Sequence, residues 1–160
     1  MGIRTIIFRG KTTSKELPIR EFNNIWVEGD LIKNRDKYYI HPHGNVFRVE
    51  HELTKLMAAH EVIPETIGQF TGLTDKNGTK IFEGDYWIDT DDDYLLYVVE
   101  FRNGQFCFVS YGVRGALMEY GWSETAGGWG ECDCEPMTDY NIETIEIFGN
   151  IHDNPELLGE

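Results

Sequence analysis

The chain has 160 residues, which is enough for one ordinary domain or two very small ones. Its hydrophobic content of 41%, with 9 Phe, 8 Tyr and 4 Trp, supplies a packed core and argues against disorder throughout. Fourteen Lys and Arg stand against 28 Asp and Glu, a formal net charge of −14. Such an acidic surface repels phosphate backbones and anionic lipids, so we expect no unaided binding to nucleic acid or membrane.

The cysteines are few and odd in number: Cys107, Cys132 and Cys134. A sparse, odd set is typical of a reducing compartment. The apolar run at residues 6–8 is far too short for a signal peptide or for the roughly 20 residues that cross a bilayer. We therefore expect a cytoplasmic protein, without membrane partners.

Short β-prone runs open the chain. We expect strands at residues 1–9, 24–27, 31–32 and 38–40, the last ended by Pro42 and Gly44. Between the second and third of these runs stands Glu28-Gly29-Asp30. Glycine tolerates a positive φ, so this tripeptide predicts a tight turn between two strands.

A helical period follows at residues 49–60. Val49, Leu53, Leu56 and Met57 recur at helical spacing, and Pro64 stops any continuation. This pattern predicts a helix of about three turns. We expect residues 1–61 to form an N-terminal β unit that contains this short helix.

Residues 75–78 (Asp-Lys-Asn-Gly) have the composition of a type I turn that ends in a left-handed residue. A second Glu-Gly-Asp follows at residues 83–85, again between β-prone runs. Two readings of this repetition stay open: two similar β units, or the coincidence of a three-residue string.

The strongest strand pattern spans residues 94–111 around Asn103-Gly104. A two-residue Asn-Gly loop favours a type I′ turn, which fixes the register of the hairpin. Arg102 then faces Gln105 and Val99 faces Phe108. Both faces of this hairpin are largely apolar, whereas a half-exposed hairpin alternates polar and apolar residues. Either both faces are covered within a small barrel, or one face packs on another subunit.

A long glycine-rich stretch occupies residues 112–138, where a short helix is expected at residues 113–120. It carries Trp122 and Trp129. Long loops in compact domains are often functional, and tryptophan is over-represented at interface hot spots. Trp122 and Trp129 are therefore candidate partner-binding residues.

Three blocks of the sequence carry a resemblance: residues 62–85, residues 147–158 and residues 26–32. In order and spacing they are similar to the YopX-like family of phage and prophage proteins. The resemblance implies a mainly β fold of small SH3-like barrels, with one or two short helices and the long Gly/Trp loop. It also implies that residues 62–160 form the YopX-like β-barrel unit, unless the chain is one continuous domain. It supplies no catalytic residues.

One acidic run imitates a calcium loop. Asp89, Asp91, Asp93 and Glu100 fall at ligand positions, but Tyr94 stands where the sharp turn needs glycine. The flanking residues also favour strands. Asp89, Asp91 and Asp93 are therefore weak metal candidates beside the simpler reading of a solvated hairpin tip. Cys132 and Cys134 lack the spacing of a zinc site.

The sequence contains neither a nucleophile elbow nor a phosphate-binding loop. We expect no catalytic residue and no cofactor. The leading hypothesis is a non-enzymatic phage accessory protein that binds protein, namely itself as a homo-oligomer and a host or phage protein. The alternatives are an acidic decoy that mimics DNA to occupy a basic host protein, and a metal-dependent enzyme that uses residues 89–93.

Overall fold

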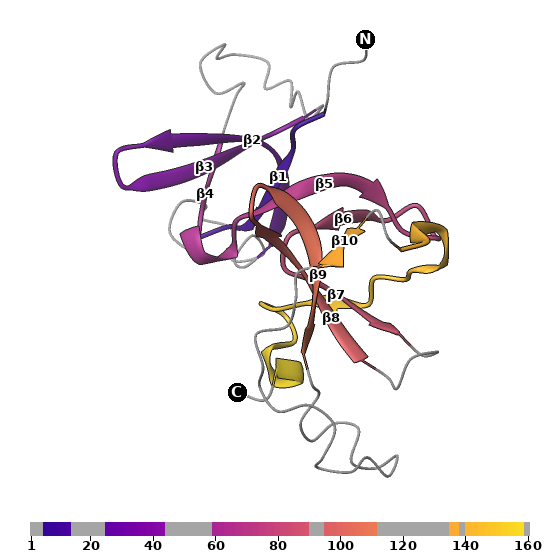
Figure 1. Cartoon of the computed structure of the whole chain (residues 1–160). Helices are drawn as coiled ribbons and strands as arrows, with labels where there is room; N and C mark the ends of the chain where they lie inside the picture. Colours follow the sequence, from indigo (N-terminus) through magenta and orange to yellow (C-terminus); the bar gives the residue numbers. More distant parts are fainter. Residues whose placement is uncertain are drawn as a thin grey trace. The chain divides into compact units, whose positions relative to one another are not determined.

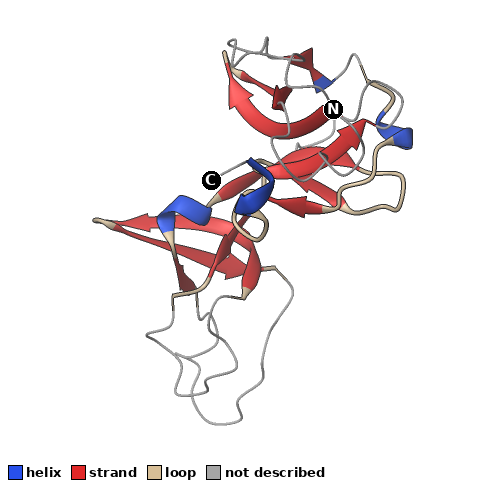
Figure 2. Ribbon diagram, turned by 90° about the horizontal axis from the view of Figure 1, so that it is seen from below, coloured by secondary structure: helices blue, strands red, loops and turns tan. Residues whose placement is uncertain are grey.

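The computed structural model describes residues 5–13, 25–43, 59–89, 95–111, 135–137 and 140–158. These residues form strands joined by turns and short 3-10 helices, so the expectation of a mainly β fold is confirmed (Figures 1 and 2). The strands are β1 (Phe8–Lys11), β2 (Trp26–Asn34), β3 (Lys37–Pro42), β4 (His60–Val62), β5 (Gly68–Thr74), β6 (Lys80–Phe82), β7 (Asp85–Asp89), β8 (Leu95–Arg102), β9 (Gln105–Tyr111), β10 (Glu135–Pro136) and β11 (Gly149–Asn150). The 3-10 helices are η2 (Pro64–Thr66), η5 (Ile142–Thr144) and η6 (Pro155–Leu158).

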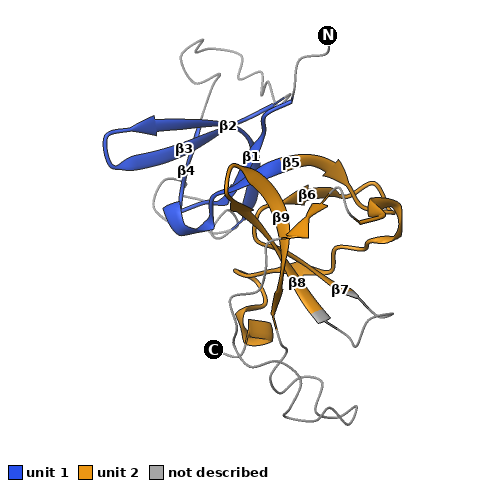
Figure 3. Ribbon diagram, in the orientation of Figure 1, with its two compact units in different colours: residues 1–70 blue, residues 71–160 orange. Residues whose placement is uncertain are grey.

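The chain divides into two compact units, Met1–Phe70 and Thr71–Glu160 (Figure 3). The boundary falls within β5. The division expected from the sequence, after residue 61, stays a prediction. The two helices expected at residues 49–60 and 113–120 lie largely or wholly outside the described residues, as does most of the Gly/Trp loop. In the described part of the chain, no helix is long and apolar enough to cross a membrane.

In unit 1 the strands follow the order β4-β3-β2-β1-β5, and the described pairings are antiparallel. The end of β1 also bonds to β4. The amide of Thr13 donates to the carbonyl of Glu61 (2.9 Å), and the amide of Ile63 donates to the carbonyl of Lys11 (2.8 Å). An isolated bridge joins Thr12 to Val62. The strands at the two sides of the β4-β3-β2-β1 order are thus hydrogen-bonded to each other.

The interior of unit 1 is narrow. Ile40 and Val62 are buried, and a Cβ added to Gly10 would lie 3.1 Å from the Val62 Cβ and 3.3 Å from the Ile40 Cδ1. Glycine at position 10 therefore lets β1 approach the side chains of β3 and β4 closely.

The turn expected at Glu28-Gly29-Asp30 is wrong, because these residues lie inside β2. Gly29 is there for close strand approach: a Cβ at this position would lie 1.9 Å from the His41 carbonyl oxygen. The chain reverses instead at residues 35–36, between β2 and β3. The second Glu-Gly-Asp does form a turn, with Gly84 at φ +84°. The repeated tripeptide therefore has two unrelated structures.

In unit 2, β6 is the neighbour of β5 in the first sheet. A second sheet has the strand order β10-β9-β8-β7-β11. The predicted β8–β9 register is confirmed in full, with Arg102 opposite Gln105 and Val99 opposite Phe108. Asn103 and Gly104 have φ values of +51° and +82°, as a type I′ turn requires.

Both faces of the β8–β9 hairpin are buried within the chain. One face joins a core cluster of Ile81, Trp87, Tyr97, Val99, Phe108, Met137 and Ile145. The other face contributes Leu96 and Val98 to a second cluster, against which Leu157 and Leu158 of η6 pack. Most of the hairpin is therefore covered on both faces within the chain, and these apolar faces do not require another subunit.

Candidate functional site

The signature turn at residues 75–78 is built around the carboxylate of Asp75. Its Oδ1 accepts hydrogen bonds from the amides of Asn77 (2.9 Å) and Thr79 (2.8 Å). Its Oδ2 accepts a hydrogen bond from the amide of Ile147 (3.1 Å). Gly78 has φ +81°, and its amide donates to the Asp75 carbonyl (2.9 Å), which confirms the predicted turn. Both carboxylate oxygens of Asp75 thus accept hydrogen bonds from backbone amides.

The ionisation of Asp75 reflects these bonds. Burial raises the pKa of its carboxyl group, but the backbone hydrogen bonds from Ile147, Thr79 and Asn77 favour the charged form. The hydrogen bonds outweigh burial, so the pKa of Asp75 lies below its ordinary value of 3.8. A buried carboxylate that is kept charged by hydrogen bonds from three backbone amides has a structural role, because it fixes the backbone at residues 77, 79 and 147.

Two other residues of the signature blocks, Asp85 and Asn150, also accept hydrogen bonds from backbone amides. Asp85 is buried, and its Oδ2 accepts a hydrogen bond from the Phe82 amide (2.7 Å) across the Glu-Gly-Asp turn. In the C-terminal block, the Asn150 Oδ1 accepts from the amides of His152 and Asp153, both at 3.0 Å. These are side chain–backbone bonds that fix turns. Asp75, Asp85 and Asn150, which belong to the blocks behind the resemblance, therefore fix turns in unit 2.

The tip of the β8–β9 hairpin exposes aromatic surface. Phe101 is 51% exposed and packs edge-on against Phe106, with ring centroids 5.0 Å apart. Next to it, Glu100 accepts hydrogen bonds from the Arg102 Nε (2.7 Å) and the Tyr111 hydroxyl (2.5 Å). An exposed aromatic ring thus sits on a hairpin that is held by a regular ladder and a side-chain network.

The structure describes only some of the site residues that the sequence predicts. Asp89 ends β7, while Asp91 and Asp93 lie outside the described residues, as do Trp122 and Trp129. Among the described residues, no three His, Cys, Asp or Glu side chains gather where a metal ion could be held.

Cys107 is fully buried and disulfide-bonded. The other two cysteines, Cys132 and Cys134, lie outside the described residues. Because disulfides are uncommon in a reducing compartment, this bond gives no support to the cytoplasmic expectation.

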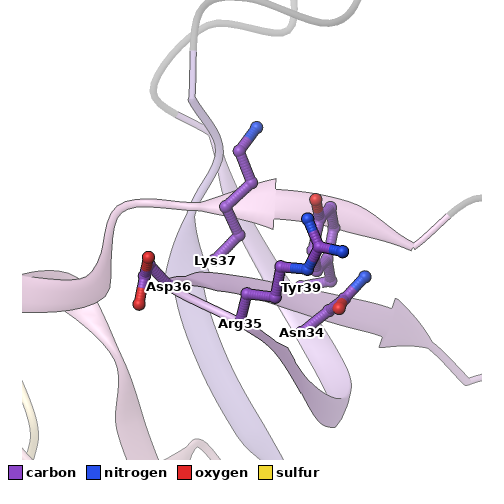
Figure 4. A pocket seen from close by; sticks show the side chains of 5 residues that line it. All are labelled: Asn34, Arg35, Asp36, Lys37 and Tyr39. Carbon is purple, nitrogen blue, oxygen red and sulfur yellow. The ribbon is translucent and has the colours of Figure 1, made fainter.

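A shallow depression of about 390 Å³ lies at the tip of the β2–β3 hairpin (Figure 4). It is lined by Asn34, Arg35, Asp36, Lys37 and Tyr39. Sequence reasoning missed this feature. The available signal was the spacing of Lys33, Arg35 and Lys37, three cations within five positions of a strongly acidic chain.

Charge is divided unequally along the sequence. Residues 1–70 contain ten of the 14 basic and nine of the 28 acidic residues, a formal charge of +1. Residues 71–160 contain the remaining four basic and 19 acidic residues, a formal charge of −15. The acidity of the protein therefore belongs to the sequence of unit 2, and unit 1 is close to neutral.

These features define a class: a small, mainly β protein whose shared motifs are structural turns. The model of one family, described as "YopX protein", matches residues 19–159. The chain belongs to the YopX family. Among solved structures, it is similar to protein EF1440 from Enterococcus faecalis, with 18% identity, 96% of this chain and 98% of that chain covered, and a TM-score of 0.44. That likeness is too low to support an argument. No functionally curated protein matches the chain.

Proposed function

We propose that this YopX-family chain is a non-enzymatic accessory protein of a phage or prophage, which binds protein and associates with copies of itself. One observation carries the proposal: Phe101 exposes half of its surface at the tip of a hairpin in which Leu96, Val98, Val99, Phe108 and Val109 are buried. Aromatic residues are enriched at protein interfaces, where they supply a large contact area at a low cost in conformational entropy.

The surroundings of Phe101 favour recognition over chance exposure. The ring already packs on Phe106, so little freedom is lost when a partner covers it. The interface is proposed to include this tip and the predicted candidates Trp122 and Trp129. Since a chain of charge −14 repels its copies, apolar burial must drive the association.

Sedimentation velocity across a salt series tests the proposal. We expect an assembly that persists at high salt, where charge repulsion is screened. A monomer at every salt concentration, with the protein at tens of micromolar, would contradict self-association.

The resemblance implies a β-barrel unit in residues 62–160, and we further propose that unit 1 also forms a small SH3-like barrel. The Thr12–Val62 bridge and the two hydrogen bonds beside it support this, because they link β1 back to β4. The cytoplasm of a bacterial host remains our proposed location. Mass spectrometry of the protein, with its thiols blocked before purification from the host, would test this location: a free thiol at Cys107 would support the cytoplasm, and the disulfide that Cys107 forms in the structure would contradict it.

The acidic decoy is a second candidate, and the division of charge favours it. With 19 acidic and only four basic residues, the sequence of unit 2 has few cations to interrupt an acidic field. A decoy displaces DNA from a basic DNA-binding protein, so increasing amounts of this chain should release labelled duplex DNA from such a protein. Unchanged DNA binding across a panel of host DNA-binding proteins would remove this candidate.

A further inference from the structure

The β2–β3 tip gathers hydrogen-bond donors around one depression. Arg35, Asn34 and Tyr39 line it together with Lys37 and Asp36. Figure 4 shows the Arg35 side chain reaching toward Tyr39 and Asn34, while the Asp36 carboxylate points to the other side of the turn. Guanidinium, amide and phenol groups can all donate hydrogen bonds to an oxyanion.

Arg35 is the group without a counter-ion. Lys37 is bound to Glu61 (2.7 Å), and the Lys33 ammonium lies over the Tyr38 ring, 5.2 Å from its centroid. In the described part of the chain, Arg35 has neither an ion-pair nor a hydrogen-bond partner for its guanidinium. The planar fork of arginine suits phosphate oxygens in particular.

The backbone at Arg35 is unusual as well. Its φ is +55°, in the left-handed region that favours glycine or asparagine. A side chain other than glycine is strained there by about 1 kcal/mol. A two-residue hairpin loop requires this positive φ at its first residue, so glycine at position 35 would relieve the strain and leave the turn in place.

The electrostatic setting does not oppose an anion. Residues 1–70 have a formal charge of +1, and residues 33–39 contain three cations and one acid, with one of the cations, Lys37, neutralised by Glu61. The repulsion expected from the net charge of −14 therefore arises from the sequence of unit 2. The depression is small and surrounded by few cations, which suits one phosphate group and not a polyanion.

From this geometry we infer that the β2–β3 tip is a binding site for a single phosphate group, with Arg35 as its anchor. Asn34 and Tyr39 donate the flanking hydrogen bonds, while Lys37 stays paired with Glu61. The source of the phosphate is either free inorganic phosphate or a small phosphorylated metabolite such as a nucleoside monophosphate.

The test is a titration of the full chain, followed by the amide NMR signals of residues 34–39. Inorganic phosphate and adenosine monophosphate serve as probes at constant ionic strength, with chloride as the reference anion. We expect phosphate to shift these signals and chloride not to. Equal affinities for the two probes would assign binding to the phosphate group alone, and tighter binding of the nucleotide would add a contact with the Tyr39 ring.

Arg35→Gly is the decisive variant, because glycine relieves the positive φ while it removes the guanidinium. Its thermal midpoint should equal or exceed that of the wild type, and its phosphate affinity should fall at least tenfold. Arg102→Ala removes the same charge from the other hairpin and should bind phosphate as the wild type does. The inference is overturned if the wild type shows no phosphate-specific shifts, if Arg35→Gly binds equally well, or if Arg102→Ala weakens binding as much.

Discussion

The carboxylate of Asp75 accepts a hydrogen bond from the backbone amide of Ile147, 72 positions further along the chain, at 3.1 Å. This bond joins two of the three sequence blocks that identify the family. A second bond runs beside it, from the amide of Lys76 to the carbonyl of Ile145 (2.9 Å). The signature residues are thus linked to one another within unit 2, and their role is structural.

Asp75→Asn should destabilise the protein by about 1–3 kcal/mol, the usual consequence of leaving a buried backbone donor without its acceptor. The asparagine amide nitrogen would face either the Ile147 amide or the turn amides, donor against donor. Urea unfolding measures the change. Asp36→Asn, on an exposed turn, is the matched control and should change stability by less than about 0.5 kcal/mol.

The stability difference between the wild type and Asp75→Asn should depend on pH. Because the pKa of Asp75 is lowered in the folded state, its charge contributes stability above pH 3.8, and this contribution is lost as the pH falls through the lower, folded value. The difference in unfolding free energy between wild type and Asp75→Asn should therefore be constant near neutral pH and shrink under strong acid. A difference that grows on acidification would show that the sign is wrong.

Gly29→Ala should be far more damaging than alanine at a turn glycine. The new Cβ would lie 1.9 Å from the His41 carbonyl oxygen, so β2 and β3 must separate, at a cost above about 2 kcal/mol. At Gly78 no atom lies within 4 Å of the added Cβ, and only the positive φ opposes alanine, by about 1 kcal/mol. Thermal melts of both variants give the comparison. Equal losses would show that the strands do not approach as closely as described.

Calcium should bind the acidic run at residues 89–93 weakly or not at all, because Tyr94 replaces the glycine that a calcium loop needs. Calorimetric titration is the measurement. Micromolar affinity that disappears in Asp89→Asn and Asp93→Asn would restore the metal-dependent enzyme as a hypothesis.

Particular residues show what the sequence can and cannot predict. The β8–β9 register could be predicted from Asn103-Gly104, because a two-residue type I′ loop allows only one pairing of the strands that flank it. The turn predicted at Gly29 was wrong, because a glycine required for the close approach of two strands cannot be distinguished in the sequence from one required for a positive φ. The reversal at Arg35 was missed for the opposite reason, because no glycine marks it.

The candidate sites were harder to predict than the fold. Long-range bonds such as that from Ile147 to Asp75 depend on tertiary packing and leave no local pattern. Phe101 was correctly paired with Phe106, but periodicity alone could not separate the exposed tip from the buried strands below it. Exposure depends on which other segments reach each face, and here the C-terminal leucines cover one of them.

The central claim is that the exposed tip of the β8–β9 hairpin, and not the family signature, makes contact with partners. The most direct test is the mass of Phe101→Ser by sedimentation at high salt, measured beside the wild type and Phe148→Ser. Phe148 is similarly exposed, at 46%, and stacks on Tyr86 away from the tip, so it is a matched control. We predict that the wild type and Phe148→Ser sediment as the same assembly and that Phe101→Ser sediments as a folded monomer. An assembly that survives unchanged in Phe101→Ser would contradict the claim.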